Sequence, residues 1–214
     1  EAPVVTETEA PATTETEAPA TTETEAPATT ETEAPAVEAP VAEGAVKTGL
    51  AVVTSVADSV DGEAKYDVTV AAVNVDENGV IVNCYIDSIG ASVKFGTDGI
   101  ITSDVAAPVL TKNELGDNYN MKLYGGATYE WYEQAAALAQ FAIGKTVEEL
   151  RAGAVNESGK ANDADLAATA TIYLGGYVAA IEKAVANAQD LGAQAGDVLK
   201  VAVLASLADS KSAE

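Results

Sequence analysis

Residues 51–59 read AVVTSVADS and residues 202–210 read AVLASLADS, so one nine-residue stretch occurs twice in the chain. Most positions are identical, and Glu63 and Glu214 stand at the same offset from the two copies. A run of Ala, Val and Leu of this length is typical of a strand. One copy opens the part of the chain that can fold and the other closes the chain, which predicts matching first and last strands. Because the chain is rich in Ala, two unrelated Ala/Val strands are the alternative.

A segment rich in Pro, Thr and Glu precedes the first copy. Residues 6–37 form four near-identical octads, each with one Pro and no large apolar residue. Such a segment cannot bury enough apolar surface to offset the entropy of folding, and Pro with repeated Glu favours an extended chain. Residues 1–46 are therefore predicted to form a disordered or extended repeat stalk that holds a domain away from a surface. An inert tail is the alternative.

The chain begins at Glu1 without Met, which indicates a mature or trimmed chain. Together with the stalk, this start predicts an extracellular or cell-surface location and a lipid or cell-wall anchor upstream of Glu1. No apolar run is long enough to cross a bilayer, so we expect no transmembrane segment. The single Cys, Cys84, cannot form an internal disulfide and is interpreted as a buried apolar residue.

Charge and composition exclude several classes of function. The chain has 34 acidic and 11 basic residues, a net charge of −23 and no His. A strongly negative chain repels nucleic acid and anionic membrane surfaces, which are therefore not expected as partners. Without His, the common serine and cysteine triads and His-ligated metal sites are excluded. We expect a protein that is not an enzyme and holds no metal.

Residues 47–214 are predicted to form a single α+β domain. Strands are expected at 49–57 and 65–75, with a bulge at Ala71–Ala72 where the alternation changes phase. Asp76-Glu77-Asn78-Gly79 predicts a tight hairpin turn, and the return strand has Val80, Val82, Cys84 and Ile86 on one face. Further strands are predicted at 91–95, 99–103 and 198–207, and residues 166–173 are expected to form a strand or an extended approach to Gly175-Gly176.

Helices are expected between these strands. Thr128 to Ile143 keeps helical spacing of apolar residues, and Thr146 with Glu149 forms a capping box for a short helix ending near Gly153. A further apolar helical face begins at Tyr177 and is expected to stop at Gly192. The predicted fold is an antiparallel sheet of about five to six strands with two or three helices packed on it.

Residues 168–185, ATATIYLGGYVAAIEKAV, resemble the FMN-binding domain of extracytoplasmic electron-transfer proteins. That family carries a Ser/Thr-Gly-Ala-Thr motif, followed by a short turn and an Ala- and Ile-rich helix. The resemblance places Thr171 on the terminal Thr, which takes FMN through a phosphoester, and Gly175 and Gly176 in the turn. In the family, the Gly of the motif lets backbone amides approach a phosphate closely. In this chain Thr169 stands in its place. The resemblance implies a related fold and, as an alternative function, FMN carried on Thr171.

Residues 113–117 and 131–135, NELGD and WYEQA, also resemble uncharacterised modules of surface lipoproteins in Gram-positive anaerobes. These modules can sit in tandem, so a unit would end where its next copy begins, which would explain the repeated strand.

Two hypotheses of function follow. The first is a non-catalytic binding or structural module displayed on a stalk, without a cofactor, which assembles with other copies of itself by strand sharing or binds a surface ligand. The second is an FMN-carrying electron-transfer module with the flavin on Thr171. An acidic glycan-binding or hydrolytic role is a third reading.

Overall fold

The structure is a computed structural model that describes residues 44–213. The predicted stalk, apart from residues 44–46, and Glu214 lie outside the described residues. The elements are β1 (Ala45–Ser55), β2 (Glu63–Val75), β3 (Ile81–Lys94), α1 (Lys112–Leu115), the 3₁₀ helix η1 (Gly116–Tyr119), α2 (Met121–Gly125), α3 (Trp131–Ala142), α4 (Val147–Ala154), α5 (Ala164–Thr169), α6 (Gly175–Ala186) and β4 (Gln189–Gln194). β1 begins two residues before the expected domain boundary.

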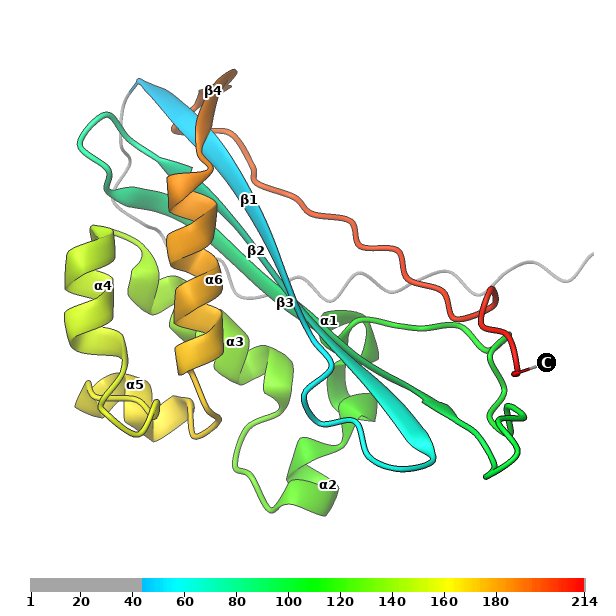
Figure 1. Cartoon of the computed structure of the whole chain (residues 1–214). Helices are drawn as coiled ribbons and strands as arrows, with labels where there is room; N and C mark the ends of the chain where they lie inside the picture. The colour runs from blue at the N-terminus through cyan, green and yellow to red at the C-terminus, as the bar shows by residue number, and fades with distance from the viewer. Residues whose placement is uncertain (1–43, 214) are drawn as a thin grey trace, which may run out of the picture. The chain divides into compact units, whose positions relative to one another are not determined.

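The strands form one antiparallel sheet in the order β3-β2-β1-β4, and α3, α4, α5 and α6 lie on one side of it (Figure 1). The predicted α+β class with an antiparallel sheet is confirmed. The sheet has four strands rather than five or six, because β3 runs unbroken through residues 91–94. Residues 99–103 add a single bridge, Phe95 to Ile101, in place of a strand.

The β2–β3 hairpin forms where its turn residues predict. The Asp76 carboxylate accepts hydrogen bonds from the amides of Asn78 and Val80, both at 2.8 Å. Gly79 has a φ of 79°, a left-handed conformation that glycine adopts without steric cost. The turn therefore fixes the pairing of the two longest strands.

The bulge predicted at Ala71–Ala72 is absent, because β2 alternates regularly there. Ala71 and Val73 face the helices, whereas Val68 and Val70 face the opposite side of the sheet. The sequence suggested a phase change because both faces of this strand carry apolar residues. The register instead shifts between Asn74 and Val75. This shift brings Ile81, rather than Val82, opposite Val75 and into the core.

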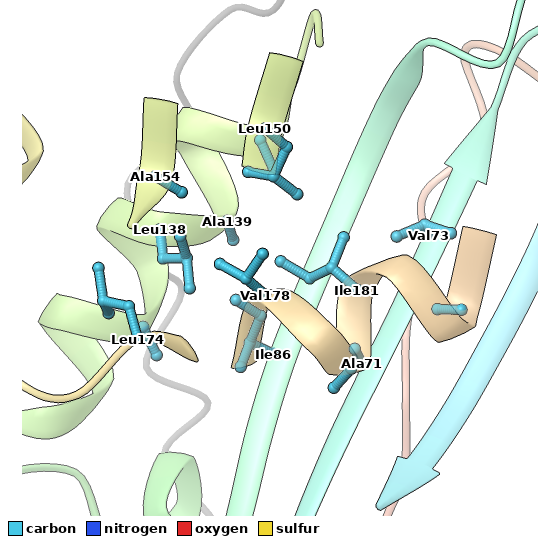
Figure 2. Packing of buried hydrophobic residues seen from close by; sticks show 14 of the residues in the cluster. Ala71, Val73, Ile86, Leu138, Ala139, Leu150, Ala154, Leu174, Val178 and Ile181 are labelled. Atoms are coloured by element: carbon cyan, nitrogen blue, oxygen red, sulfur yellow. The ribbon is translucent and has the colours of Figure 1, made fainter. Parts of the chain in front are cut away.

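The core lies between the sheet and the helices. Figure 2 shows Val178 and Ile181 of α6 between the β-strands and the side chains of Leu138 and Leu150 from α3 and α4. Leu138, Leu150 and Ile181 have no exposed surface. Each such side chain, removed from water, contributes on the order of 2 kcal/mol to the hydrophobic stabilisation of the fold.

Capping boxes stand at the starts of α1, α3 and α4. Thr146 caps α4 together with Glu149, as predicted. α3 starts at Trp131 with Glu130 as its N-cap, rather than at Thr128. The buried Glu130 carboxylate also accepts hydrogen bonds from the amides of Met121 and Lys122 at 2.7 and 3.1 Å. One carboxylate therefore joins the start of α3 to the start of α2.

The last third of the fold differs from the prediction in three places. Residues 166–173, expected as a strand, contain most of α5, which Asp163 caps through the amides of Asp165 and Leu166 at 3.0 Å. α6 ends at Ala186, well before Gly192. Residues 198–207, expected as the closing strand, form one isolated bridge and no strand.

α6 and β1 approach each other most closely at Gly49. A Cβ at this position would overlap the carbonyl oxygen of Ala184 in α6 and lie 3.1 Å from the Cα of Ala188. Glycine therefore permits the helix backbone to rest on the strand backbone. This contact places the end of α6 so that β4 can pair with β1.

Gly49→Ala is expected to lower the free energy of unfolding by about 1–3 kcal/mol, because its Cβ must displace the α6 backbone. Urea unfolding followed by circular dichroism measures the change. Gly90→Ala is the matched control: Gly90 lies inside β3, where a Cβ meets only Asp67 Oδ1 at 3.8 Å. This control should stay within about 0.5 kcal/mol of the parent chain. Equal losses would contradict the importance of the contact.

Burial raises the pKa of the Cys84 thiol from 9.0 to about 12. Because the thiolate is the reactive form, its fraction at about pH 8 should fall roughly a thousandfold. The folded protein is expected to react with Ellman's reagent far more slowly than the same protein in guanidinium. Equal rates in the folded and unfolded chain would show that the thiol is not enclosed.

Candidate functional site

The residues predicted to bind a cofactor come together in one loop. Thr171, Gly175 and Gly176 lie between α5 and the first turn of α6, and Thr171 is exposed. Leu174 stands at the N-cap position of α6 and provides no side-chain cap. The first turn of this helix therefore carries amide groups without a side-chain acceptor, next to the positive end of the helix dipole.

Gln134 of α3 determines the shape of this loop. Its Oε1 accepts hydrogen bonds from the amides of Thr171 and Ile172 at 2.8 and 3.1 Å, and from the Thr171 hydroxyl at 3.3 Å. Its Nε2 donates to the carbonyl oxygen of Tyr129 at 2.9 Å. The side chain is fully buried, so these bonds satisfy polar groups that water does not reach.

These bonds reduce the fit of the loop to a phosphate. The amides of Thr171 and Ile172 already donate to Gln134, so they do not form a free cradle. The ring of Tyr173 occupies the space where a Cβ of Gly175 would lie, so it covers one side of the helix start. The Lys160 ammonium donates to the carbonyl oxygen of Thr171 at 2.7 Å and brings a positive charge to the loop.

The described residues offer little other chemistry for a site. Within residues 44–213, no group of three or more His, Cys, Asp or Glu side chains is arranged to hold a metal ion. In the same residues, no helix has the length and apolar character needed to span a membrane.

The second candidate site is an open strand edge. β4 pairs with Ala45, Lys47 and Thr48 of β1, and the pairing of the two strands does not extend beyond Thr48. Leu50–Ser55 therefore pair with β2 on one side, and among residues 44–213 no strand pairs with them on the other. An unpaired edge presents backbone donors and acceptors that another strand can bind.

One side chain of α6 and one from the residue after it reach this edge. The Asn187 amide donates to the carbonyl oxygen of Leu50 at 3.0 Å, and the Lys183 ammonium donates to that of Val52 at 2.9 Å. Because backbone direction alternates along a strand, Leu50, Val52 and Thr54 all point their amides and carbonyls outward. The edge is thus partly covered by flexible side chains and by no other strand.

Apolar side chains gather beside this edge. Leu50 and Val52 are 52% and 46% exposed and point away from α6. Val53, on the face toward the helices, is also exposed. Isolated exposed apolar residues are common on protein surfaces, but three within four positions beside an open strand edge form an apolar patch.

The second copy of the repeated stretch lies on the sheet face opposite α6. The terminal segment, residues 198–213, follows β4 and is drawn in orange and red in Figure 1. A hollow of about 400 Å³ lies between it and the sheet, lined by Tyr66, Val68 and Ile89 on one side and by Leu207 on the other. The terminal segment is therefore loosely packed.

Few hydrogen bonds hold the terminal segment. Ala205 forms an isolated bridge with Val109. The Ser212 hydroxyl accepts from the amide of Ile101 at 3.0 Å, and the amide of Ala213 donates to Gly99 at 3.0 Å. Leu204, the third residue of the repeated stretch, is 97% exposed. The segment is extended but lacks the strand partners that β1 has.

The two copies nevertheless share one local geometry. The amide of Ala57 donates to the Ser55 hydroxyl at 3.1 Å, and the amide of Ala208 donates to the Ser206 hydroxyl at 3.1 Å. The turn that follows is also the same, since Ser59 donates to Val56 at 3.1 Å and Ser210 to Leu207 at 2.9 Å. The repeated sequence therefore encodes an extended segment followed by a fixed turn in both places.

No family model, no curated protein and no solved structure matches this chain.

The sequence located the loop and the repeat but not all the residues that shape them. Gln134 was missed, although it stands three residues after Trp131 on an apolar helix face, where a polar residue signals a buried hydrogen-bonding role. Lys183 and Asn187 carry no such signal, because exposed polar residues on a helix are ordinary. Their position at the edge of β1 follows from the α6 contact at Gly49.

Proposed function

We propose that this protein is a non-catalytic structural module that binds further copies of itself by β-strand addition. In this proposal residues 202–207 of one copy pair with the sheet of another. The observation that carries it is the shared geometry of the two copies of the repeat. One copy is paired in the sheet, whereas the other has one backbone bridge and an almost fully exposed Leu204.

Strand addition uses the physical features of the terminal segment. Main-chain hydrogen bonds provide affinity when an extended segment joins a sheet edge, and alternate side chains provide specificity. The segment is already extended, which reduces the conformational entropy lost on binding. Backbone amides and carbonyls of this segment, together with its exposed Leu204, gain partners on pairing.

Charge limits how such copies can meet. The chain carries a net charge of −23, so two copies repel each other at long range. Residues 48–57 and 201–208 carry no ionisable side chain, so a contact between them brings no like charges together. Association through these segments should strengthen when salt screens the repulsion, whereas association by ion pairs should weaken.

The proposed setting is extracellular or at the cell surface. The repeat stalk of residues 1–46 supports it, since an acidic chain rich in Pro is suited to hold a module away from a surface. A structural module in that position acts by linking neighbouring copies, and needs no cofactor.

Leu204→Asp is expected to abolish self-association and leave the fold intact, because Leu204 is exposed in the single copy and would become enclosed on pairing. Light scattering after size-exclusion chromatography measures the mass, and thermal unfolding measures the fold. Val198→Asp is the matched control: Val198 is 79% exposed in the same segment but outside the repeat. Association is expected to persist in this control.

A wild-type chain that keeps the monomer mass at every concentration and salt level would overturn the proposed function. An equal mass for the wild-type chain and for a chain lacking residues 198–214 would overturn it as well.

A second proposal is that Thr171 carries FMN as an electron-transfer group. The exposed Thr171, the uncapped start of α6 and the nearby Lys160 ammonium support it. The amides committed to Gln134 and the ring of Tyr173 count against it. The chain's own contribution would be a hydroxyl at position 171 that forms the ester and a positive charge beside it.

Co-expression with a flavin transferase tests this second proposal. The purified chain should be yellow with flavin absorbance, Thr171→Ala should be colourless, and Thr171→Ser should keep the colour because it keeps the hydroxyl. A colourless wild-type chain, or equal flavin content in Thr171→Ala, would rule out the ester.

A further inference from the structure

A second copy offers two positions for residues 202–207. They would either replace β1 beside β2, or add to the open edge of β1 beyond β4. Both positions would use the same backbone groups of the incoming segment. The structure distinguishes them through the contact between β1 and α6.

Replacement of β1 conflicts with α6. The repeat aligns Ala202 with Ala51, so Lys200 falls on Gly49. At Gly49 even a Cβ would overlap the carbonyl oxygen of Ala184. A Lys there would push α6 away from the sheet and open the core, because close-packed interiors do not absorb such a volume. The terminal segment therefore lacks the glycine that the β1 position requires.

We propose that residues 202–207 of one copy add to the open edge of β1, at Leu50–Ser55 of a second copy, in line with β4. This inference rests on the self-association proposed above and names its acceptor. The edge and the incoming segment are each six residues long. Strand addition requires no rearrangement of the β1–β2 pairing or of the core.

The edge has the groups that this addition needs. Leu50, Val52 and Thr54 direct their backbone amides and carbonyls outward. The incoming strand donates to the carbonyl oxygens of Leu50 and Val52 in place of Asn187 and Lys183, whose exposed side chains can turn into solvent. Leu204 then lies beside the exposed apolar residues of the edge. Each side thus gains the partner that it lacks in a single copy.

The donor is a second copy because of the direction of β4. β4 is antiparallel to β1, so the chain leaves it at the Ala45 end of the edge, away from Leu50–Ser55. The chain's own terminal segment then crosses the opposite face of the sheet, next to Tyr66 and Val68. To reach a neighbour it must give up its bridge from Ala205 to Val109 and its contact with the hollow beneath it.

Thr54→Pro in the full chain tests the acceptor. Proline removes an outward amide and adds bulk at the edge, while the pairs of Val53 and Ser55 with β2 are kept. We expect the monomer mass for Thr54→Pro and the associated mass for Thr54→Val, with unchanged circular dichroism in both. A folded Thr54→Pro chain that associates like the wild type, while Leu204→Asp does not, would overturn the edge as acceptor and leave the proposed function standing.

Complementation separates donor from acceptor. Thr54→Pro keeps an intact terminal segment, and Leu204→Asp keeps an intact edge, so each is expected to be monomeric alone. An equimolar mixture should form a dimer of one of each, because one donor and one acceptor remain. Two monomers in the mixture would overturn the proposal.

Disulfide trapping decides the position even if proline disturbs the fold. Chains with Leu204→Cys are mixed with chains carrying Val53→Cys, Thr54→Cys or Thr69→Cys. Edge addition places residue 204 next to residues 53 and 54, whereas replacement of β1 places it opposite Thr69, the partner of Val53. A strand at the edge is about 10 Å from β2, too far for a disulfide. Trapping at 53 or 54 supports the edge. Trapping at 69, or at none of the three in a chain that associates, overturns it.

Discussion

The close contact between the backbones of α6 and β1 determines the arrangement of the rest of the sheet. Gly49 lets the carbonyl oxygen of Ala184 occupy the space of a side chain. Because α6 is held there, its side chains Val178 and Ile181 fill the space between the sheet and α3, as Figure 2 shows. The same contact holds the end of α6 near β1, where the chain continues into β4 after Ala186.

The two copies of the repeat show how far local sequence determines structure. Both form the same Ser-capped turn, with amide-to-hydroxyl distances of 3.1 Å. Only the first copy is a strand, because only it has β2 beside it and α6 above it. Strand propensity describes how well a segment fits a partly buried pleated surface, and it cannot provide the surface itself. The terminal segment is therefore extended like a strand, but it is not part of a sheet.

The sequence predicted the parts of the fold that depend on local signals. The Asn78-Gly79 hairpin and the Thr146 capping box formed as expected, because each is specified within a few residues. The strand expected at 166–173 does not form, because Asp163 caps a helix there. The alternating Ala and Thr residues lack the apolar pattern from which this helix could be predicted. β4 was not predicted, because the stretch from Gln189 to Gln194 is exposed and lacks an apolar pattern.

The candidate sites also combine features that the local sequence predicts with features that depend on packing. The repeat and the loop around Thr171 are visible in the sequence, because motifs are local. The hydrogen bonds from the amides of this loop to Gln134 form because α3 packs against the loop. No local sequence pattern encodes that packing. The open edge of β1 is a property of topology, because it exists only where β4 ends.

The way this fold protects its edge also bears on how specific an assembly can be. Proteins usually block open strands with charges, prolines or covering segments. Here the blocking groups are Lys183 and Asn187, which bind two carbonyls but leave the outward amides and the apolar side chains of Leu50 and Val52 available. The strong negative charge of the chain opposes random contacts between copies, and a contact between uncharged segments adds no local repulsion to it. General repulsion combined with one neutral, extended, partly guarded edge favours a single mode of pairing over unspecific aggregation.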